Sequence, residues 1–401
     1  MRTKLRYQSI GVRLTTLIVA CCGMTVTQVS GEPDGYKVYA LDSLGGTSSR
    51  GDGINNRGLA TGYSNLAGNT SRHAAAWLRG DMRDLGTLGG PNSSVVFAVK
   101  DDQNIVVGIS QTATPDTSGE IWSSGFFYPG PNNVGYVNLA FAWEKGQMRG
   151  LPTLGGIHGF AAGVNNRGQA VGWAENTCQD GTCVPPQIYQ FRPVHWDLKH
   201  GDRIGEFPLF APDDTSGAAV AINDAGQAVG ITGICDQAIG RYTAKHAVLW
   251  EKDTVTDLGN LGAEFWNTPT AINNSGTIVG FAGDPAFPEG DILHGFIWTK
   301  ATGIQPLPPL ADRNPEHVDS EPYGLNDQGQ AVGISCDADF TDCRGVLWEN
   351  GEAQDLNDPD NTGFVGVIDQ AKDINNAGQI TGRVIDPNTL AKVAIIAIPA
   401  D

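Results

Sequence analysis

The sequence has few basic residues and lacks the short signatures of several well-marked enzyme classes. Its 26 Lys and Arg residues are outnumbered by 44 Asp and Glu residues, which gives a formal net charge of −18. A chain this acidic is repelled by nucleic acid and by anionic membrane surfaces, so neither is an expected partner. It contains no GxSxG, HExxH, Walker loop or sialidase-type Asp-box. We therefore expect no catalytic residue set and no cofactor.

Patterns typical of metal sites are also missing. The sequence has no CxxC pair and no histidine cluster, which argues against a zinc site. Asp337, Asp339 and Asp342 offer oxygen ligands at calcium-like spacing, but they do not follow the EF-hand order. We expect no metal site.

The N-terminal segment differs in composition from the rest of the chain. Its first 31 residues contain four basic residues and no acid, then an apolar run over 14–26 and a small-residue ending. This order predicts a secretory signal peptide over residues 1–31, followed by a single domain over 32–401. Residues 18–21 also resemble a lipoprotein lipobox, and lipidation at Cys21 is the alternative. Either route predicts an exported protein, extracellular or periplasmic, whose only membrane contact would be a lipid anchor at Cys21.

Five cysteines follow the signal segment, and four of them form close pairs in the sequence. Cys178 and Cys183 lie in CQDGTC, and Cys336 and Cys343 lie in CDADFTDC. In an exported protein such short-range pairs are typical of disulfides. We predict the pairs Cys178–Cys183 and Cys336–Cys343, with Cys235 left over.

A ten-residue phrase recurs seven times: an aliphatic residue, Asn, two variable residues, Gly, and an apolar run closed by a second Gly. The copies are GINNRGLATG from Gly53, AVKDDQNIVVG from Ala98, GVNNRGQAVG from Gly163, AINDAGQAVG from Ala221, AINNSGTIVG from Ala271, GLNDQGQAVG from Gly324 and DINNAGQITG from Asp373. Asn-x-x-Gly fits a tight turn between two strands, with Asn104 replacing Gly in the degenerate second copy. Asp373 breaks a run of Gly and Ala and is expected to face a central channel.

Two further motifs follow the hairpins and predict a third and a fourth strand, except that the seventh hairpin is followed only by a third strand near 393–398. The third ends in Trp, as in HAAAW at Trp77, and the fourth has the form DLGTLGG from Asp84. Four short strands per repeat of about 50 residues are typical of a β-propeller blade. The fourth-strand motif also precedes the first hairpin, as YALDSLGG from Tyr39. We therefore predict an all-β, monomeric, seven-bladed β-propeller of four-stranded blades, closed by an N-terminal strand that completes the last blade.

These motifs resemble the HAF-repeat family of exported bacterial proteins, named for the His-Ala-Phe run that this chain shows as HAAAW, HAVLW and HGFIW. The resemblance spans residues 36–399 and implies an extracellular, propeller-like repeat protein. It implies no catalytic residues and no substrate class. The chain departs from the pattern at Leu139, Arg192 and Arg344, which stand where the family has His.

Long, unequal loops between second and third strands are predicted to gather on one rim, at roughly 111–138, 174–190 and 232–244. The first of them is rich in aromatic residues, which stack on sugar rings or anchor protein partners. The predicted ligand-binding residues are Trp122, Phe126, Phe127, Tyr128 and Tyr136. The alternative is that this loop folds onto a hydrophobic cluster of its own.

The absent motifs and the variable rim together favour an exported, non-catalytic binding module. Its expected partner is a glycan or an exported or cell-envelope protein, held by the long loops. The alternative is a hydrolase or lyase of extracellular polysaccharide that uses rim carboxylates.

Overall fold

The computed structural model describes residues 35–400 except 99, 121–126, 131–133, 237–239, 253, 288–291, 312–315, 359–360 and 362. These residues belong to one compact unit, Pro33–Asp401. Each regular element named in this part of the chain is a β-strand. No helix among the described residues has the length and apolar character needed to cross a membrane. The signal peptide predicted over residues 1–31 and Cys21 lie outside the described residues.

Five four-stranded antiparallel sheets follow one another along the chain. The first contains β6 (Gly89–Ser94), β7 (Val106–Pro115), β8 (Tyr136–Glu144) and β9 (Gln147–Gly150). The second contains β10 (Gly159–Val164), β11 (Gln169–Gln179), β12 (Tyr189–Asp197) and β13 (Arg203–Glu206). The third contains β14 (Ser216–Ile222), β15 (Ala228–Gly233), β16 (His246–Glu251) and β17 (Thr254–Asp257). The fourth contains β18 (Thr268–Ile272), β19 (Ile278–Gly283), β20 (Leu293–Thr299) and β21 (Gly303–Pro306). The fifth contains β22 (His317–Leu325), β23 (Ala331–Asp337), β24 (Cys343–Glu349) and β25 (Glu352–Asp355).

An eight-stranded sheet joins the two ends of the described chain. It contains β26 (Val367–Ile374), β27 (Ile380–Ile385), β28 (Lys392–Pro399), β2 (Gly45–Ile54), β3 (Leu59–Leu66), β4 (Arg72–Leu78) and β5 (Asp81–Asp84). β28 and β2 meet at one parallel bridge between Ser48 and Lys392. The remaining strand, β1 (Tyr36–Ala40), pairs antiparallel with β28. The N-terminal strand thus completes the C-terminal set of strands, as the fourth-strand motif near Tyr39 predicts.

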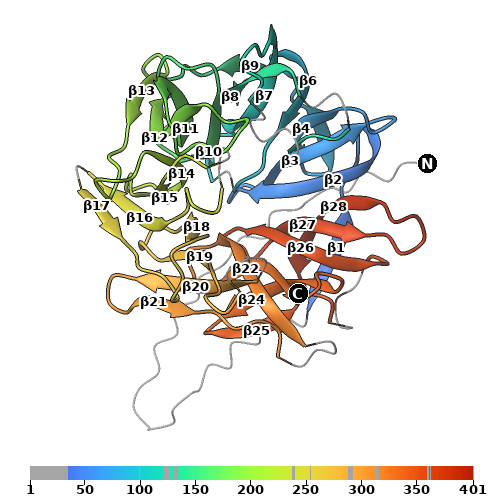
Figure 1. The fold of residues 1–401 in the computed structure, drawn as a ribbon. Helices are drawn as coiled ribbons and strands as arrows, with labels where there is room; N and C mark the ends of the chain where they lie inside the picture. The colour runs from blue at the N-terminus through green and yellow to red at the C-terminus, as the bar shows by residue number, and fades with distance from the viewer. Residues whose placement is uncertain are drawn as a thin grey trace, which may run out of the picture. The chain divides into compact units, whose positions relative to one another are not determined.

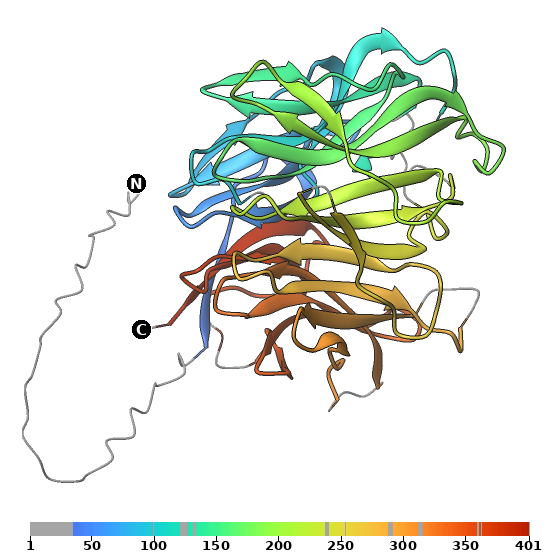
Figure 2. The same cartoon turned by 90° about the vertical axis from the view of Figure 1, so that its left-hand side faces the viewer.

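The sheets stand side by side as propeller blades do. The first strands of successive sheets contact each other from β10 through β14, β18, β22 and β26 to β2. Figure 1 shows these strands near the centre and the fourth strands, such as β13, β17 and β25, at the periphery. In Figure 2 the blue N-terminal strand lies against the red C-terminal strands. The described chain is therefore an all-β, propeller-like array, which confirms that part of the predicted fold class, while the count of seven blades remains a prediction.

The recurring Asn and Gly residues each meet a specific demand of the hairpin turn. In the first copy, Asn55 Oδ1 accepts the N–H groups of Arg57 and Leu59, and Gly58 has a φ of 77°. The first strand bulges between Gly51 and Gly53. A Cβ at Gly62 would lie 2.0 Å from the Arg50 carbonyl oxygen. The second Gly of the repeat is therefore required by the bulge in the facing strand.

The degenerate second copy keeps the turn by different means. Asn104 has a φ of 66°, in the left-handed region, as predicted. Asp101 replaces the first Asn and accepts the N–H of Ile105 at 2.7 Å. The sequence variation in this copy therefore preserves the backbone path of the turn.

The second residues of the hairpin turns are linked in a closed circuit, which we call the turn ring. In each link, a backbone N–H donates to the side-chain oxygen of the corresponding residue in the next turn, at 2.7–3.0 Å. The order is Asn56, Asp102, Asn166, Asp224, Asn274, Asp327, Asn376 and back to Asn56. The ring borders a small cavity of about 40 Å³. This end of the unit is therefore formed by short, mutually bonded turns.

The tryptophan of the third strand fixes several of the blades to the segment that leads into them. The indole N–H of Trp77 donates to the Asp42 carbonyl at 2.9 Å. Trp250 and Trp348 bond in the same way to Pro208 and Pro308. All three side chains are buried. The Trp motif therefore marks a packing position within the blade.

Candidate functional site

The irregular connections of the described chain lie at the end opposite the turn ring, and we call this end the loop rim. It consists of the connections between second and third strands and between each fourth strand and the next sheet. Three long connections occupy 116–135, 180–188 and 234–245, close to the predicted ranges. Because the scaffold beneath is regular, the differences between blades are concentrated on this rim.

Among the described residues, six successive connections between a second and a third strand each expose one large apolar side chain. They follow β7, β11, β15, β19, β23 and β27. Their exposed fractions range from 40% to 74%, and the residues are Val134, Val184, Tyr242, Phe287, Phe340 and Leu390. We call these six side chains the apolar tips. One exposed apolar side chain is ordinary, but one per connection on six neighbouring connections forms a patterned surface.

Two of the apolar tips are held in an unfavourable backbone conformation. Phe340 has a φ of 55° and Leu390 a φ of 56°. Bulky residues are disfavoured there, whereas Gly and Asn are accepted. The corresponding turn after β3 places Asn69 at a φ of 57°. Exposed hydrophobic residues thus stand in two turns where Gly or Asn would adopt the backbone conformation with less strain.

The longest rim loop is anchored on both sides. Arg72, at the start of β4, donates from Nη1 to the Phe127 carbonyl at 2.7 Å. On the other side, Glu120 accepts the backbone N–H groups of Ile188 and Tyr189 at 2.7 and 3.0 Å. The loop over 116–135 is therefore tied to the sheets before and after its own.

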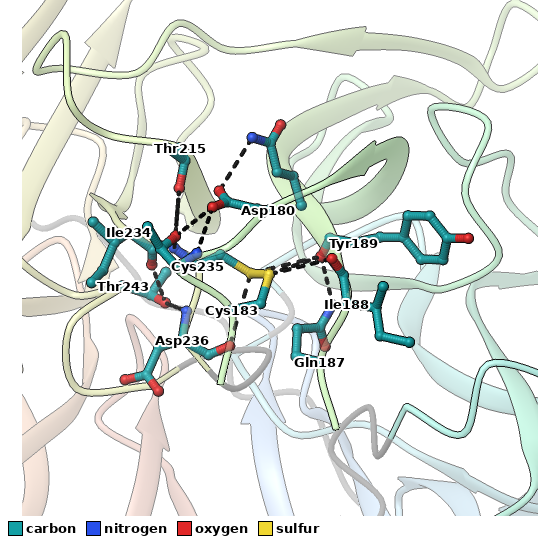
Figure 3. Close-up of a disulfide and its surroundings, with 12 residues drawn as sticks. Asp180, Cys183, Gln187, Ile188, Tyr189, Thr215, Ile234, Cys235, Asp236 and Thr243 are labelled. Atoms are coloured by element: carbon teal, nitrogen blue, oxygen red, sulfur yellow. Dashed lines mark hydrogen bonds between the residues drawn. A yellow bond between two sulfur atoms is a disulfide. The ribbon is translucent and has the colours of Figure 1, made fainter. Parts of the chain in front are cut away.

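A disulfide extends this connection to the next blade, and it differs from the predicted pairing. Cys183 bonds to Cys235 with a Cα–Cα separation of 4.4 Å, and Cys178 is an exposed free thiol. The predicted pair Cys178–Cys183 is therefore wrong. Cys178 still belongs to β11 and its side chain is exposed, whereas Cys183 lies beyond the following turn, beside the loop that carries Cys235 (Figure 3).

The second predicted disulfide, Cys336–Cys343, is confirmed. The two cysteines are directly opposite each other in the register of β23 and β24, and their Cα atoms are 4.2 Å apart. Two disulfides point to an extracellular or periplasmic environment.

The rim contacts continue beyond the loop that carries Cys235. The Trp266 N–H donates to the Arg241 carbonyl, and the Asn267 N–H donates to the Ala244 carbonyl at 2.8 Å. The Arg241 guanidinium lies 4.2 Å from the centroid of the Phe265 ring. Contacts therefore link the rim from β4 to the connection before β18.

The predicted aromatic ligand-binding residues have different environments. Trp122 and Phe126 lie outside the described residues. Tyr128 is 4% exposed, and burial raises the pKa of its hydroxyl above the usual range. Phe127 is half-buried and its ring centroid lies 5.3 Å from that of Phe160. Tyr136 is half-buried at the start of β8. Ligand binding by these residues remains a prediction.

A buried cluster beneath this loop has the composition of a metal site but not the hydrogen bonding of one. Atoms of Glu120, His158 and Glu175 lie within 4.8 Å of one another. His158 Nδ1 accepts the backbone N–H of Asn138 at 3.0 Å. A neutral imidazole then carries its proton on Nε2, which lies 3.6 Å from Asp116 Oδ2. His158 therefore presents a proton, and not a lone pair, to the surrounding carboxylates, and the donor set does not fit a cation.

The carboxylates of this cluster have divergent proton affinities. Burial and the charge of Glu120 together raise the pKa of Glu175 to about 7, against the opposing effect of His158. Burial would also raise the pKa of Asp116, but hydrogen bonds from His158 and Ser118 outweigh it and hold the pKa at about 2. The cluster is a hydrogen-bonded anchor for the loop over 116–135.

Sequence reasoning missed the apolar tips because no single loop looks unusual. Each tip is one hydrophobic residue among polar turn residues, as Phe340 is in DADFTD. A signal was available in the recurrence of such a residue in the connection between second and third strands of successive repeats. Aligning the loops by strand position, and not by composition, would have detected it.

Comparisons with known proteins show distant structural likeness only. No protein-family profile and no curated protein matches the chain. The β-propeller domain of the Trilobed protease from Pyrococcus furiosus is 11% identical, with a TM-score of 0.44 over 75% of this chain and 78% of that chain. An oligogalacturonate lyase in complex with manganese is 10% identical, with a TM-score of 0.47 over 91% and 96%. Trypanosoma rangeli sialidase is 8% identical, with a TM-score of 0.40 over 91% and 58%. Membership of the HAF-repeat family remains a prediction.

Proposed function

We propose that this chain is an exported, non-catalytic, seven-bladed β-propeller that binds an exported protein through its loop rim. The apolar tips carry the proposal, because they place one hydrophobic contact on each of six neighbouring loops. Apolar anchors within a polar surround are the usual composition of a protein-binding surface.

The count of seven blades is supported by the turn ring. Each of its members belongs to one copy of the ten-residue phrase, and the hydrogen bonds return from Asn376 to Asn56. The eight-stranded sheet then corresponds to two blades, β2 to β5 and β26 to β28 with β1. A ring completed by its own N-terminal strand leaves no open sheet edge between its ends, which favours a monomer.

A protein is favoured over a glycan by the nature of the tips. Three of them, Val134, Val184 and Leu390, are aliphatic and cannot stack on a sugar ring as an aromatic face does. The net charge of −18 favours a partner with basic groups around its apolar contacts. The polysaccharide-cleaving alternative has less support, because Glu120 and Glu175 accept backbone N–H groups within the rim.

Export follows from the predicted signal peptide over residues 1–31 and from the oxidised cysteine pairs. Cleavage after residue 31 would release a soluble domain over 32–401, whereas lipidation at Cys21 would hold the same domain at a membrane. In both cases the rim would meet exported proteins.

The test compares a rim variant with a matched control. The rim variant carries Tyr242→Ser, Phe287→Ser and Phe340→Ser, and the control carries Tyr39→Ser and Leu78→Ser, which are exposed apolar residues away from the rim. Substitutions of exposed side chains such as these change the free energy of unfolding by about 0.5 kcal/mol or less each. Wild-type and variant proteins are immobilised and exposed to the exported protein fraction, and the retained proteins are quantified by mass spectrometry.

We expect a protein that the wild type and the control retain and that the rim variant loses. Its purified form should bind the rim variant at least about tenfold more weakly than the wild type. A glycan-array signal that survives in the rim variant, or equal retention by all three proteins, would contradict the proposal.

A further inference from the structure

The first strands of the blades line the central axis, so the residues at equivalent positions of these strands can be compared with one another. The residues three positions before the first turn residue are Asp52, Ala98, Ala162, Val220, Thr270, Tyr323 and Lys372. Those five positions before it are Arg50, Val96, Phe160, Ala218, Thr268, Glu321 and Gln370. Four consecutive blades thus use small or apolar residues or Thr at both positions. The three neighbouring strands β22, β26 and β2 instead carry charged and hydrogen-bonding groups.

In β2 these groups form a tight cluster around a tyrosine. Arg50 Nε donates to Asp52 Oδ1 at 2.7 Å, and Arg50 Nη1 donates to Gln370 Oε1 at 3.0 Å. The guanidinium carbons of Arg50 and Arg72 lie 5.2 and 3.6 Å from the centroid of the Tyr63 ring. Burial would raise the pKa of Tyr63, but the two guanidinium charges outweigh it and lower the pKa. Two cations therefore lie close to one aromatic ring.

In β22 and β26 a lysine occupies the corresponding place. Lys372 Nζ lies 3.2 Å from the centroid of the Tyr323 ring, and the Tyr323 hydroxyl donates to Glu321 at 2.8 Å. Burial and the charge of Arg50 lower the pKa of Lys372 to about 7, against the opposing charges of Asp52 and Glu321. The Lys372 side chain is half-buried, with protein groups on most sides.

The positive charges of the cluster are only partly compensated. Arg50 pairs with Asp52, and Arg383 pairs with Asp369. Within the described part of the chain, no carboxylate oxygen lies within 4.0 Å of the Arg72 or Lys372 side-chain nitrogens. Burial raises the pKa of nearby Asp319 to about 8, so this carboxyl is mostly uncharged at neutral pH. The cluster is thus a positive region inside an acidic protein.

Burying such groups costs free energy that the other blades do not incur. A charge moved away from water loses hydration, and an incomplete ion pair does not restore it. Because Val220 and Ala162 occupy the same position in equivalent strands, the ring can be built without a charge there. The charges on β22, β26 and β2 therefore call for a role beyond packing.

We propose that Arg72 and Lys372, with the tyrosine faces of Tyr63 and Tyr323, form an axial binding site for a ligand that carries a single carboxylate. The two cations without a close carboxylate partner supply the attraction. Asp52 and Glu321 limit the net positive charge, so the site matches a monoanion better than a phosphate dianion. Among the described residues, Arg72 uses Nε and Nη1 for Asn65 and Phe127 and leaves Nη2 for the ligand.

Arg72 is the first residue of β4, directly after a rim turn, whereas Lys372 lies three residues before the first turn residue of its own hairpin, so the site extends along the axis between the two ends. The carboxylate could belong to a uronate sugar or to a peptide, and both offer the same chemistry to the two cations. This site does not depend on the apolar tips, so it can fail or succeed independently of the proposed rim function.

Calorimetric titrations at about pH 6, where Lys372 is protonated, test the proposal with four probes. D-glucuronate represents the sugar source and N-acetylglycine the peptide source. D-glucose is the uncharged control, and inorganic sulfate, which is a dianion at this pH, is the control for the charge of the ligand. Lys372→Met and Arg72→Gln remove the two cations. Lys392→Met is the matched control, because Lys392 is exposed on β28.

We expect one carboxylate probe to bind the wild type and Lys392→Met equally, and to bind Lys372→Met and Arg72→Gln at least about tenfold more weakly. The probe that binds identifies the source of the carboxylate. Near-UV circular dichroism verifies that each variant is folded, and the triple rim variant should retain binding. Binding of none of the probes, equal binding of sulfate, or binding unchanged by Lys372→Met would overturn the proposal.

Discussion

The first asparagine of each hairpin turn serves two structures at once. Its side-chain oxygen closes its own turn, and its amide donates to a carbonyl in the next turn. Asn326 shows both roles, since Oδ1 accepts the N–H groups of Gln328 and Gln330 and Nδ2 donates to the Asn375 carbonyl at 3.2 Å. Asp101 in the second copy can keep only the first role, because a carboxylate has no N–H. The first residues of the other six turns each donate a side-chain amide hydrogen bond to a backbone carbonyl of the next turn. Among the described residues, the corresponding bond from Asp101 to the Asn165 carbonyl is accordingly absent.

Substitutions at Asn326 should separate these roles. Asn326→Asp keeps the acceptor for the turn and loses the two hydrogen bonds that Nδ2 donates, to the Asn375 carbonyl and to Gln330 Oε1, which costs about 2 kcal/mol of unfolding free energy. Asn326→Ala loses both roles and leaves buried N–H groups without a partner, so we expect a cost of about 3 kcal/mol. Urea denaturation measures both values, with Asn388→Ala in an exposed turn as the control. Equal costs for Asp and Ala would show that the turn contacts contribute nothing.

The rim loops gain their order from contacts with their neighbours and not from strand pairing. The loop over 116–135 is held by Arg72 and Glu120, and the loops that carry Cys183 and Cys235 are joined covalently. A cross-link that closes a chain of 52 residues restricts the unfolded state more than one that closes 7. The inter-loop disulfide should therefore stabilise the protein more than Cys336–Cys343 does.

Cysteine variants test this pairing and its consequence. Cys235→Ser should lower the free energy of unfolding by about 4 kcal/mol, Cys336→Ser by about 2 kcal/mol, and Cys178→Ser by almost nothing, according to loop-closure entropy. A count of free thiols cannot distinguish the two pairings, because each leaves one cysteine unpaired. Peptide mapping without reduction can, and a peptide pair joining Cys178 to Cys183 would refute the arrangement described above.

Most of the strand order was predictable because it depends on local signals. Asn-x-x-Gly marks the turn between the first and second strands of a repeat. The Trp and Gly motifs follow it in a fixed order and mark the third and fourth strands. The axial cluster was not predictable in this way, since Arg50 and Gln370 are separated by 320 positions in the chain and meet only when the ends come together. The prediction for Cys183 failed for the same reason. Its true partner, Cys235, lies 52 positions away in the chain, whereas Cys178 is only five positions away.

The seam between the C-terminal and N-terminal blades is reinforced by contacts beyond those of the turn ring. The second turn residues alternate between Asn and Asp, and an odd number of turns places Asn376 beside Asn56. At this seam Asp373 accepts the Ile54 N–H at 2.8 Å and pairs with Lys100 at 2.5 Å. The departure of Asp373 from the Gly and Ala run is thus explained by its contacts across the seam. β1 adds a further link, because it joins the N-terminal segment to β28.

Closure by β1 can be tested by placing the same substitution on its two faces. Val38 is fully buried, whereas the neighbouring Lys37 is exposed. Val38→Asp would bury an unpaired charge between β1 and the core, detach the strand and expose the edge of β28. We expect a loss of more than about 3 kcal/mol in unfolding free energy, together with oligomers in size-exclusion chromatography that form through the free edge.

Lys37→Asp introduces the same residue into the same strand on its exposed face. Its unfolding free energy should stay within about 0.5 kcal/mol of the wild type, and the variant should remain monomeric. If both variants behave like the wild type, β1 does not hold the ends of the propeller together.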